Sequence, residues 1–154
     1  MTRPAGQTDV EFVQWAFGEI ELGAATDMIA LFEHEPIVAR LEGALAPDAL
    51  VEFETPDGGF MGGMAGPFRG LAGLQRGWAE WTHPWEAWSF RPTDWIDAGR
   101  GRVLLLGDST GRMAGSRVEI EAHVAALYTV ESDEIVRIQH FLDQDQARRA
   151  AGLL

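Results

Sequence analysis

Several residue types that often carry chemistry are scarce or missing in this chain of 154 residues, which has no cysteine, no lysine and one tyrosine. The absence of cysteine excludes disulfide bonds, thiolate metal sites and a cysteine nucleophile, and it is compatible with a reducing compartment. Without lysine, the glycine-rich stretch from Gly58 to Gly66 lacks the basic residue of a phosphate-binding loop. No apolar run approaches eighteen residues, and the N-terminus has no signal-like apolar core. We therefore expect a cytoplasmic protein.

The charge of the chain is strongly acidic, with a formal net charge of -12 at pH 7. Nucleic acids and anionic membrane surfaces would both repel such a protein, so we expect neither as a partner. The hydrophobic content of 46% is sufficient for a real core in a chain of this length. We therefore expect a single globular domain over residues 1–154.

The first half of the chain carries mostly helical patterns. Thr8 and Glu11 form a capping-box pattern, and apolar residues follow at helical spacing as far as Ile20, before a stop at Gly23. Further helices are predicted over residues 24–33, from Pro36 to about Gly43, and over residues 71–81. A strand is predicted between the last two, over residues 50–54, and the glycine-rich stretch 55–70 reads as a long loop.

After residue 84 the apolar period changes from that of a helix to two. Strands are predicted over residues 87–96, 103–112, 117–130 and 135–142, with turn-like links between them. Short links imply an antiparallel meander, and a short final helix covers about 144–151. We therefore predict an α+β fold in which three to four N-terminal helices pack on a curved mixed or antiparallel sheet. Such an arrangement makes a cone with a pocket at its open end.

Several strings in the chain resemble a known group of proteins. They are "GPFRGLAGL" (66–74), "DWIDAGRGRVLLL" (94–106), "GR..GSRVEIEAHVAALYTVESDEIVRIQHFLD" (111–143) and "QARRAAGL" (146–153). With them the chain resembles the SnoaL-like polyketide cyclases of the nuclear transport factor 2-like (ketosteroid isomerase-like) superfamily. The resemblance implies the cone fold and a homodimer that packs through the outer face of the sheet. It also implies that the long segment 28–49 inserts an extra helix near the mouth of the cavity.

Asp143 is the first candidate for chemistry, because it lies where the last strand meets the final helix. An Asp followed three residues later by Gln146 is a helix-capping pattern, which by itself would stabilise the helix by roughly 0.5 to 2 kcal/mol. The resemblance implies a second role, since SnoaL-like cyclases use an Asp of the last strand as general acid/base beside a carbonyl. An apolar pocket would raise the pKa of such a carboxyl and suit it to proton transfer. The two roles are compatible.

Strand alternation separates the histidines. Phe141 and Asp143 share one face of the last strand, and His140 lies among apolar neighbours on the opposite face, where we expect it to pack against that second face, for example in a dimer contact. His123 shares a face of the preceding strand with Ala125 and Leu127. If His123 and Asp143 both face the cavity, they form an acid/base pair. The alternative for His123 is a hydrogen-bonded histidine on the sheet surface.

The aromatic residues are concentrated where a cavity is expected. Core packing is their first explanation, but some of them would also line an apolar cavity suited to a flat hydrophobic ligand. The predicted pocket residues are Trp15, Phe53, Trp78, Trp81 and Phe141. The glycine-rich loop could cover this pocket as a lid. Histidine spacing matches no metal-binding pattern, so we expect neither a metal nor a cofactor.

Two better-known activities of the same fold do not match the sequence. Steroid isomerases use a tyrosine of the first helix, where this chain has Trp15 and Phe17. Epoxide hydrolases use an Arg-x-Asp pair, which the strand ending in Asp108 lacks. We therefore expect a small-molecule pocket protein, either a cofactor-independent cyclase- or isomerase-like enzyme that performs acid/base chemistry beside a carbonyl, or a non-catalytic module for hydrophobic-ligand binding or dimerisation.

Overall fold

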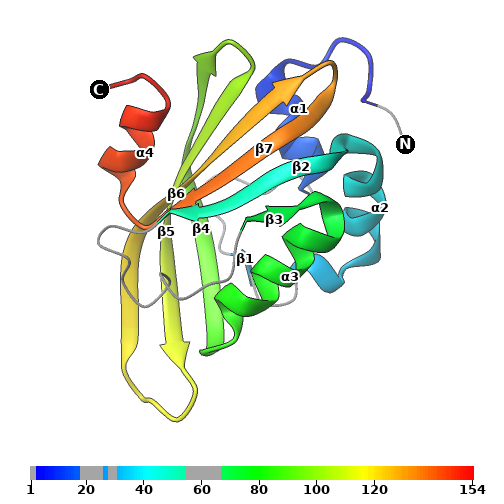
Figure 1. The fold of residues 1–154 in the computed structure, drawn as a ribbon. Helices are drawn as coiled ribbons and strands as arrows, with labels where there is room; N and C mark the ends of the chain where they lie inside the picture. Colours follow the sequence, from blue (N-terminus) through cyan, green and yellow to red (C-terminus); the bar gives the residue numbers. More distant parts are fainter. Residues whose placement is uncertain (1–2, 18–25, 28–30, 55–66) are drawn as a thin grey trace.

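The computed structural model describes residues 3–17, 26–27, 31–54 and 67–154, which form an α+β fold (Figure 1). In chain order the elements are α1 (Asp9–Ala16), β1 (Thr26–Asp27), the 3-10 helix η1 (Leu31–Glu33), α2 (Glu35–Ala44), β2 (Leu45–Glu54), β3 (Phe68–Arg69), α3 (Gly70–Thr82), β4 (Trp85–Gly99), β5 (Arg102–Met113), β6 (Glu119–Glu131), β7 (Glu134–Phe141) and α4 (Gln144–Ala150). The predicted fold class, with helices before a run of strands and a short helix at the end, is confirmed.

The capping box predicted at the start of α1 is present. The Thr8 hydroxyl accepts a hydrogen bond from the Glu11 amide at 3.1 Å, and the Glu11 carboxylate accepts one from the Thr8 amide at 3.1 Å. These two bonds hold the pKa of Glu11 below its ordinary value, and the bond from the Thr8 backbone has the larger effect. The helix ends at Ala16, and the predicted continuation to Ile20 and Gly23 lies outside the described residues.

The helix predicted over residues 24–33 is wrong where the structure describes it. Thr26 and Asp27 pair with Phe90 and Ser89 at the edge of the sheet, and only residues 31–33 turn, as η1. Sheet pairing with a long neighbouring strand has overridden a weak local helical pattern. By contrast, α2 begins with Pro36 in its first turn, as predicted. None of the helices within the described ranges is long and apolar enough to cross a membrane.

The sheet has seven strands in the order β1-β4-β5-β6-β7-β2-β3. The four long strands β4 to β7 follow one another as the predicted antiparallel meander. β2 then pairs with β7 in parallel, with Val51 opposite Ile138, so the sheet is mixed. β2 begins at Leu45 rather than at the predicted residue 50, with a register shift between Leu45 and Leu50. The parallel pairing brings the middle of the chain beside its end.

The helices divide the sheet into two faces, as Figure 1 shows with α1, α2 and α3 on one side and α4 on the other. We call the side covered by α1 to α3 the inner face and the side covered by α4 the outer face. Val124, Ala126 and Tyr128 of β6 belong to the large core cluster of the inner face. Ala125 and Leu127 of the same strand belong to a smaller cluster beneath α4. The alternation along β6 therefore separates the two faces.

Candidate functional site

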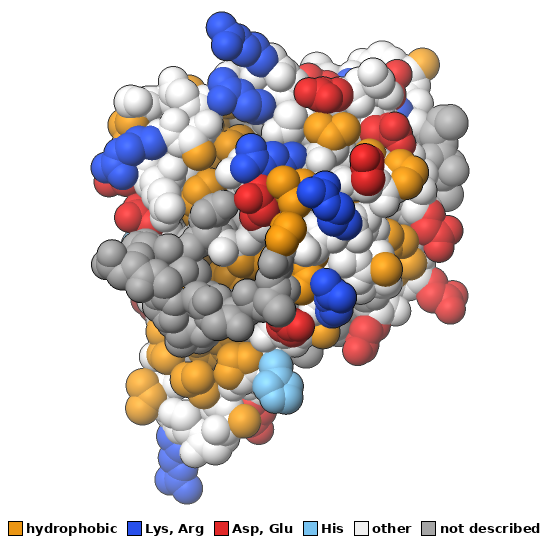
Figure 2. Space-filling model, viewed as in Figure 1, with side chains coloured by type: hydrophobic (Ala, Val, Ile, Leu, Met, Phe, Trp, Pro, Cys, Tyr) orange, Lys and Arg blue, Asp and Glu red, His pale blue; other side chains and the backbone are white. Residues whose placement is uncertain are grey.

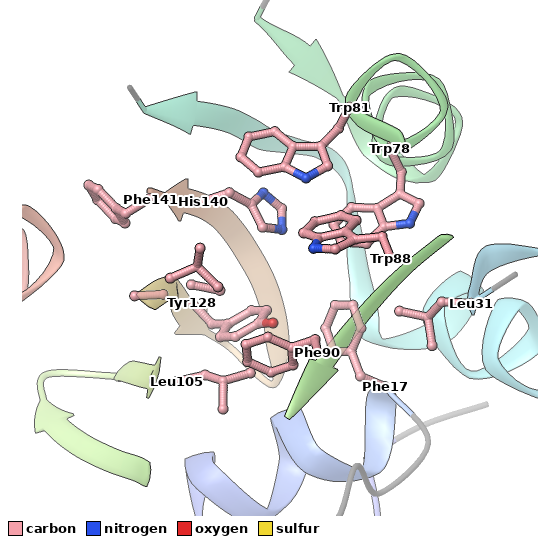
Figure 3. A pocket seen from close by; sticks show the side chains of 13 residues that line it. Phe17, Leu31, Trp78, Trp81, Trp88, Phe90, Leu105, Tyr128, His140 and Phe141 are labelled. Atoms are coloured by element: carbon pink, nitrogen blue, oxygen red, sulfur yellow. The ribbon is translucent and has the colours of Figure 1, made fainter. Parts of the chain in front are cut away.

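The candidate site is a cavity on the inner face of the sheet, beneath the C-terminal half of α3. It contains about 570 Å³ of space that no atoms fill, the open mouth included. Figure 3 shows the cavity and the aromatic side chains around it. Its described lining residues are Phe17, Leu31, Trp78, Trp81, Trp88, Phe90, Leu105, Val124, Ala125, Ala126, Tyr128, His140 and Phe141. Besides the indole N–H groups of the three tryptophans, which can only donate, the polar side-chain groups of this lining belong to His140 and Tyr128.

Three tryptophans form one wall of the cavity. Trp78 and Trp81 lie three residues apart on α3, so both point from the same face of the helix toward the sheet. Trp88 of β4 stacks on Trp78, with the ring centroids 5.5 Å apart and the planes inclined by 25°. It also contacts Trp81, at 5.7 Å between centroids. These contacts hold the three rings against one another, and they make this wall of the cavity aromatic.

His140 is the polar group at the centre of the site. It projects from β7 into the cavity (Figure 3), and its ring stacks on Phe53 with the centroids 4.7 Å apart. Its Nδ1 atom is fully enclosed and has no hydrogen-bond partner among the described residues. Burial lowers the pKa of His140 to about 4, against an opposing hydrogen bond with the Glu52 backbone. The imidazole is therefore neutral at neutral pH, and one of its ring nitrogens can accept a proton or a hydrogen bond.

Tyr128 supplies the second polar group. Its side chain is 5% exposed and is held between Phe17, 5.2 Å away, and Trp95, 6.5 Å away, measured between ring centroids. Burial raises the pKa of Tyr128, so the hydroxyl stays protonated and can donate a hydrogen bond. Because Ala126 pairs with His140, Tyr128 is the diagonal neighbour of His140 on the same face.

The structure places Asp143 at the start of α4 and outside the cavity. Its carboxylate accepts hydrogen bonds from the amides of Asp145, at 2.8 Å, and Gln146, at 3.4 Å. The predicted helix cap is confirmed. The described cavity lining does not include Asp143. The catalytic role suggested by the resemblance therefore has no support from the position of this carboxylate.

His123 lies on the outer face, and its side chain is 80% exposed. Its Nδ1 atom is 2.6 Å from a carboxylate oxygen of Asp108, whose other oxygen accepts a hydrogen bond from Arg91 at 3.0 Å. The hydrogen bond with His123, followed by that with Arg91, lowers the pKa of Asp108. The expectation that His123 and Asp143 both face the cavity is wrong. The alternation along each strand is as predicted. The cavity, however, is lined by the face that carries His140 and Tyr128, and not by the face that carries His123.

The structure places the predicted ligand-pocket residues differently from one another, and their role in ligand binding stays a prediction. Trp78, Trp81 and Phe141 line the cavity, although the ring of Phe141 points away from it in Figure 3 and packs with Leu106 in the cluster under α4. Phe53 supports His140 from behind. Trp15 is not among the described lining residues and stacks on Phe12, 6.2 Å away between centroids. The lid predicted over Gly58–Gly66 lies outside the described residues.

Sequence reasoning missed both polar groups of the cavity. The strand alternation predicts His140 on the face opposite to Asp143, and Tyr128 is not among the predicted pocket residues. A signal for both exists, because Val124, Ala126 and Tyr128 alternate as an uncharged face, whereas Glu119, Glu121 and His123 share the other face. Within the described residues, no group of three or more His, Asp or Glu side chains could hold a metal ion.

Comparisons with known proteins agree with this architecture. The sequence model of the SnoaL-like domain family matches residues 28–138. A crystal structure assigned as a SnoaL-like polyketide cyclase from Jannaschia sp. CCS1 superposes with a TM-score of 0.64 at 13% identity, covering 100% of this chain and 99% of that one. No protein of curated function matches the chain significantly.

Two further solved structures show the same fold. TerC, co-crystallised with polyporic acid, has a TM-score of 0.62 at 13% identity, with 94% of this chain and 98% of that one covered. A nuclear transport factor 2-like protein of unknown function from Burkholderia pseudomallei has a TM-score of 0.61 at 17% identity, with 93% and 97% covered. At these identities the superpositions establish the fold and leave the activity open.

Proposed function

Since the chain belongs to the SnoaL-like domain family, we propose that it binds a small, flat, hydrophobic molecule in the cavity between α3 and the inner face of the sheet. The observation that carries this proposal is the lining of the cavity, which is mainly aromatic and apolar, with His140, Tyr128 and the indole N–H groups of the tryptophans as its polar groups. Ligand cavities in proteins typically combine apolar walls with a small number of placed polar groups. The co-crystal of TerC with polyporic acid is a precedent for a bound molecule in this fold.

The two polar groups restrict the chemistry of the ligand. A buried hydroxyl or imidazole nitrogen left without a partner costs about 1 to 3 kcal/mol of desolvation, so a ligand that satisfies them is strongly preferred over an apolar molecule of the same shape. Tyr128 offers a donor, and the unpartnered ring nitrogen of His140 offers an acceptor or a donor, depending on the tautomer. A ligand with a carbonyl or hydroxyl group next to an aromatic ring fits both.

A cavity-filling variant tests this proposal. Ala126→Leu places three extra carbon atoms on the cavity floor, and Ala79→Leu makes the same change on the exposed side of α3. With β-naphthol as probe, we expect ligand-induced quenching of tryptophan fluorescence in the wild type and in Ala79→Leu, and at least a tenfold weaker affinity in Ala126→Leu. Melting temperatures of all three proteins separate overpacking, which costs about 1 to 3 kcal/mol, from loss of the site. Equal affinity in Ala126→Leu, or no binding to the wild type, would contradict the proposal.

A second candidate function is a cofactor-independent, cyclase- or isomerase-like enzyme, and it is favoured by the joint presence of His140 and Tyr128 in one cavity. In this candidate a neutral His140 takes a proton from a carbon next to a carbonyl. The electron pair of that C–H bond forms a C=C bond, and the π pair of the C=O bond moves onto the oxygen. The Tyr128 hydroxyl stabilises the resulting enolate by hydrogen bonding. The proton then returns to carbon. The low pKa of His140 makes it a weak base in the empty cavity, so binding remains the first proposal.

Proton exchange decides whether this chemistry occurs. The probe is β-tetralone in deuterium oxide, and NMR follows the loss of the proton signal beside the carbonyl. We expect the wild type to accelerate exchange and His140→Phe to lose about a hundredfold or more of that acceleration, which is the usual size of a general-base contribution. The exposed His83→Gln serves as a matched control. If His123→Gln or Asp143→Asn removes the exchange and His140→Phe does not, the pair predicted from the sequence carries the chemistry instead.

A further inference from the structure

A second chamber adjoins the cavity on the same face of the sheet. Its described lining residues are Trp81, Trp85, Trp88, Ser109, Gly111, Ile120, Ala122, Val124 and Leu142, and it contains about 530 Å³ of space, the open mouth included. Three of these residues, Trp81, Trp88 and Val124, also line the first cavity. The two spaces are therefore neighbours that share a wall rather than separate sites.

Small residues of β5 make room for the second chamber. On the inner face of this strand Gly107, Ser109 and Gly111 alternate, so three consecutive inward positions carry little or no side chain. A Cβ atom at Gly107 would collide with the ring of Phe90, and one at Gly111 would lie 2.7 Å from the ring of Trp85. Both aromatic rings thus lie directly over the strand, and the hydroxyl between them belongs to Ser109.

Ser109 is the only residue with a side-chain hydroxyl or charge among the described residues that line this chamber. It is 4% exposed, and its Oγ atom is enclosed without a hydrogen-bond partner among the described residues. An enclosed hydroxyl normally finds a partner, because leaving it unpaired costs about 1 to 3 kcal/mol. A site that binds a ligand oxygen is expected to have an unpaired hydroxyl when no ligand is bound. The Ser109 hydroxyl, in an apolar chamber next to the cavity, fits this expectation.

The chamber also reaches the surface. Ile120, which lines it, is 44% exposed, and Val118 nearby on the same chain segment is 68% exposed. Figure 2 shows hydrophobic side chains gathered on the lower part of the molecule, where the hairpin of β5 and β6 projects in Figure 1. A ligand that fills both spaces could thus enter from this end.

From these observations we propose that the ligand of the cavity is elongated, with one oxygen bound by His140 and Tyr128 and a second oxygen at its far end bound by Ser109. The inference rests on the proposed function and adds a specificity residue to it. His140 pairs with Ala126, whereas Ser109 pairs with Ala122 one strand further across the sheet. Two strand spacings and four residues along the strands separate the two positions by roughly 16 Å between backbones. A rod of two linked rings with a hydrogen bond at each end can bridge that gap, and a single ring is too short.

Two biphenyl probes test the far-end contact. One is the symmetric diol with a hydroxyl at each end, and the other is para-phenylphenol, with a hydroxyl at one end only. We expect Ser109→Ala to weaken the binding of the diol by about three- to tenfold, which corresponds to the loss of one hydrogen bond. The affinity for para-phenylphenol should not change. Thr110→Val removes a hydroxyl from the neighbouring, outward position of β5 and should change neither affinity. Titration calorimetry measures all the affinities.

A second variant and a shorter probe make the outcomes distinguishable. Ala122→Leu narrows only the second chamber. It should therefore weaken the binding of both biphenyl probes and leave the affinity for β-naphthol unchanged. If β-naphthol binds but neither biphenyl probe does, or if Ser109→Ala affects both biphenyl probes equally or not at all, the elongated ligand is wrong and the proposed function survives. If no probe binds, both proposals fail together.

Discussion

At the scale of single residues, His140 shows how a fold converts an ordinary side chain into a special one. Its ring contacts Phe53, Trp78 and Trp81, and the enclosure lowers its pKa from the usual 6.5 to about 4. Desolvation disfavours the charged form of a base, and the hydrogen bond with the Glu52 backbone offsets this effect only in part. The result is an imidazole that remains neutral over the whole physiological range.

This shift predicts that acid destabilises the protein through His140. Because the folded-state pKa lies below the unfolded value, the unfolded chain binds the proton more tightly between about pH 4 and pH 6.5. The contribution to stability is fully present above pH 6.5 and is lost as the pH falls toward 4. We expect a loss on the order of 1 to 2 kcal/mol between pH 7 and about pH 5, measured by urea unfolding.

The variants for this measurement are His140→Phe, which keeps a stacked ring, and His83→Gln, which changes an exposed histidine. Between pH 7 and about pH 5, His140→Phe should lose less stability than the wild type, by on the order of 1 to 2 kcal/mol. His83→Gln should behave like the wild type, because its surroundings change little on unfolding. An unchanged pH dependence in His140→Phe would show that His140 is accessible to solvent and not the buried group described here.

At the scale of elements, α4 illustrates how a short helix depends on its first residue. The helix has seven residues, too few to be stable alone, and it covers Leu104, Leu106 and Leu127 on the outer face of the sheet. Asp143 satisfies two of its free amides. The two arginines in its last turn, Arg148 and Arg149, are placed favourably for the helix dipole.

Substitution of Asp143 therefore has a predicted structural effect. Asp143→Ala should lower the free energy of unfolding by about 0.5 to 2 kcal/mol, and Asp143→Asn by less, because an amide oxygen also caps. Thermal unfolding measures both, and binding of β-naphthol should be retained at saturating probe in each folded variant. A loss of catalysed exchange in Asp143→Asn with an unchanged melting temperature would restore the acid/base role that the resemblance implies.

At the scale of the whole molecule, the homodimer implied by the resemblance stays a prediction. On the outer face, α4 covers the sheet near Phe141, whereas Arg91, Asp108 and His123 form an exposed charged group. Two chains with a net charge of -12 each would repel one another, and salt screens that repulsion. A dimer of this protein should therefore strengthen with ionic strength.

Sedimentation velocity at low and high salt tests this expectation. We expect a dimer whose fraction rises with added sodium chloride, and a lower dimer fraction for His123→Glu, which adds a negative charge beside Asp108 on the outer face. A chain that sediments as a monomer at all salt concentrations would exclude the dimer. An unchanged dimer in His123→Glu would place the contact away from the charged group on the outer face.

By itself, the sequence determined the parts of this protein that depend on local physics. The capping pattern of Thr8 and Glu11, the helical spacing of Trp78 and Trp81 and the period of two after residue 84 reflect interactions within an element or between successive strands. The structure has all of them. The short β1 was missed because its two residues are held by a partner about sixty positions away in the chain.

Which face of the sheet lies inside depends on how the helices pack against it, and the sequence pattern does not contain that information. An alternating pattern is unchanged when its two faces are exchanged, so it separates His140 from Asp143 without saying which one lies in the cavity. The packing of α3 on one face and of α4 on the other breaks that symmetry. It places His140, Tyr128 and Ser109 inside and leaves Asp143 as a cap and His123 in solvent.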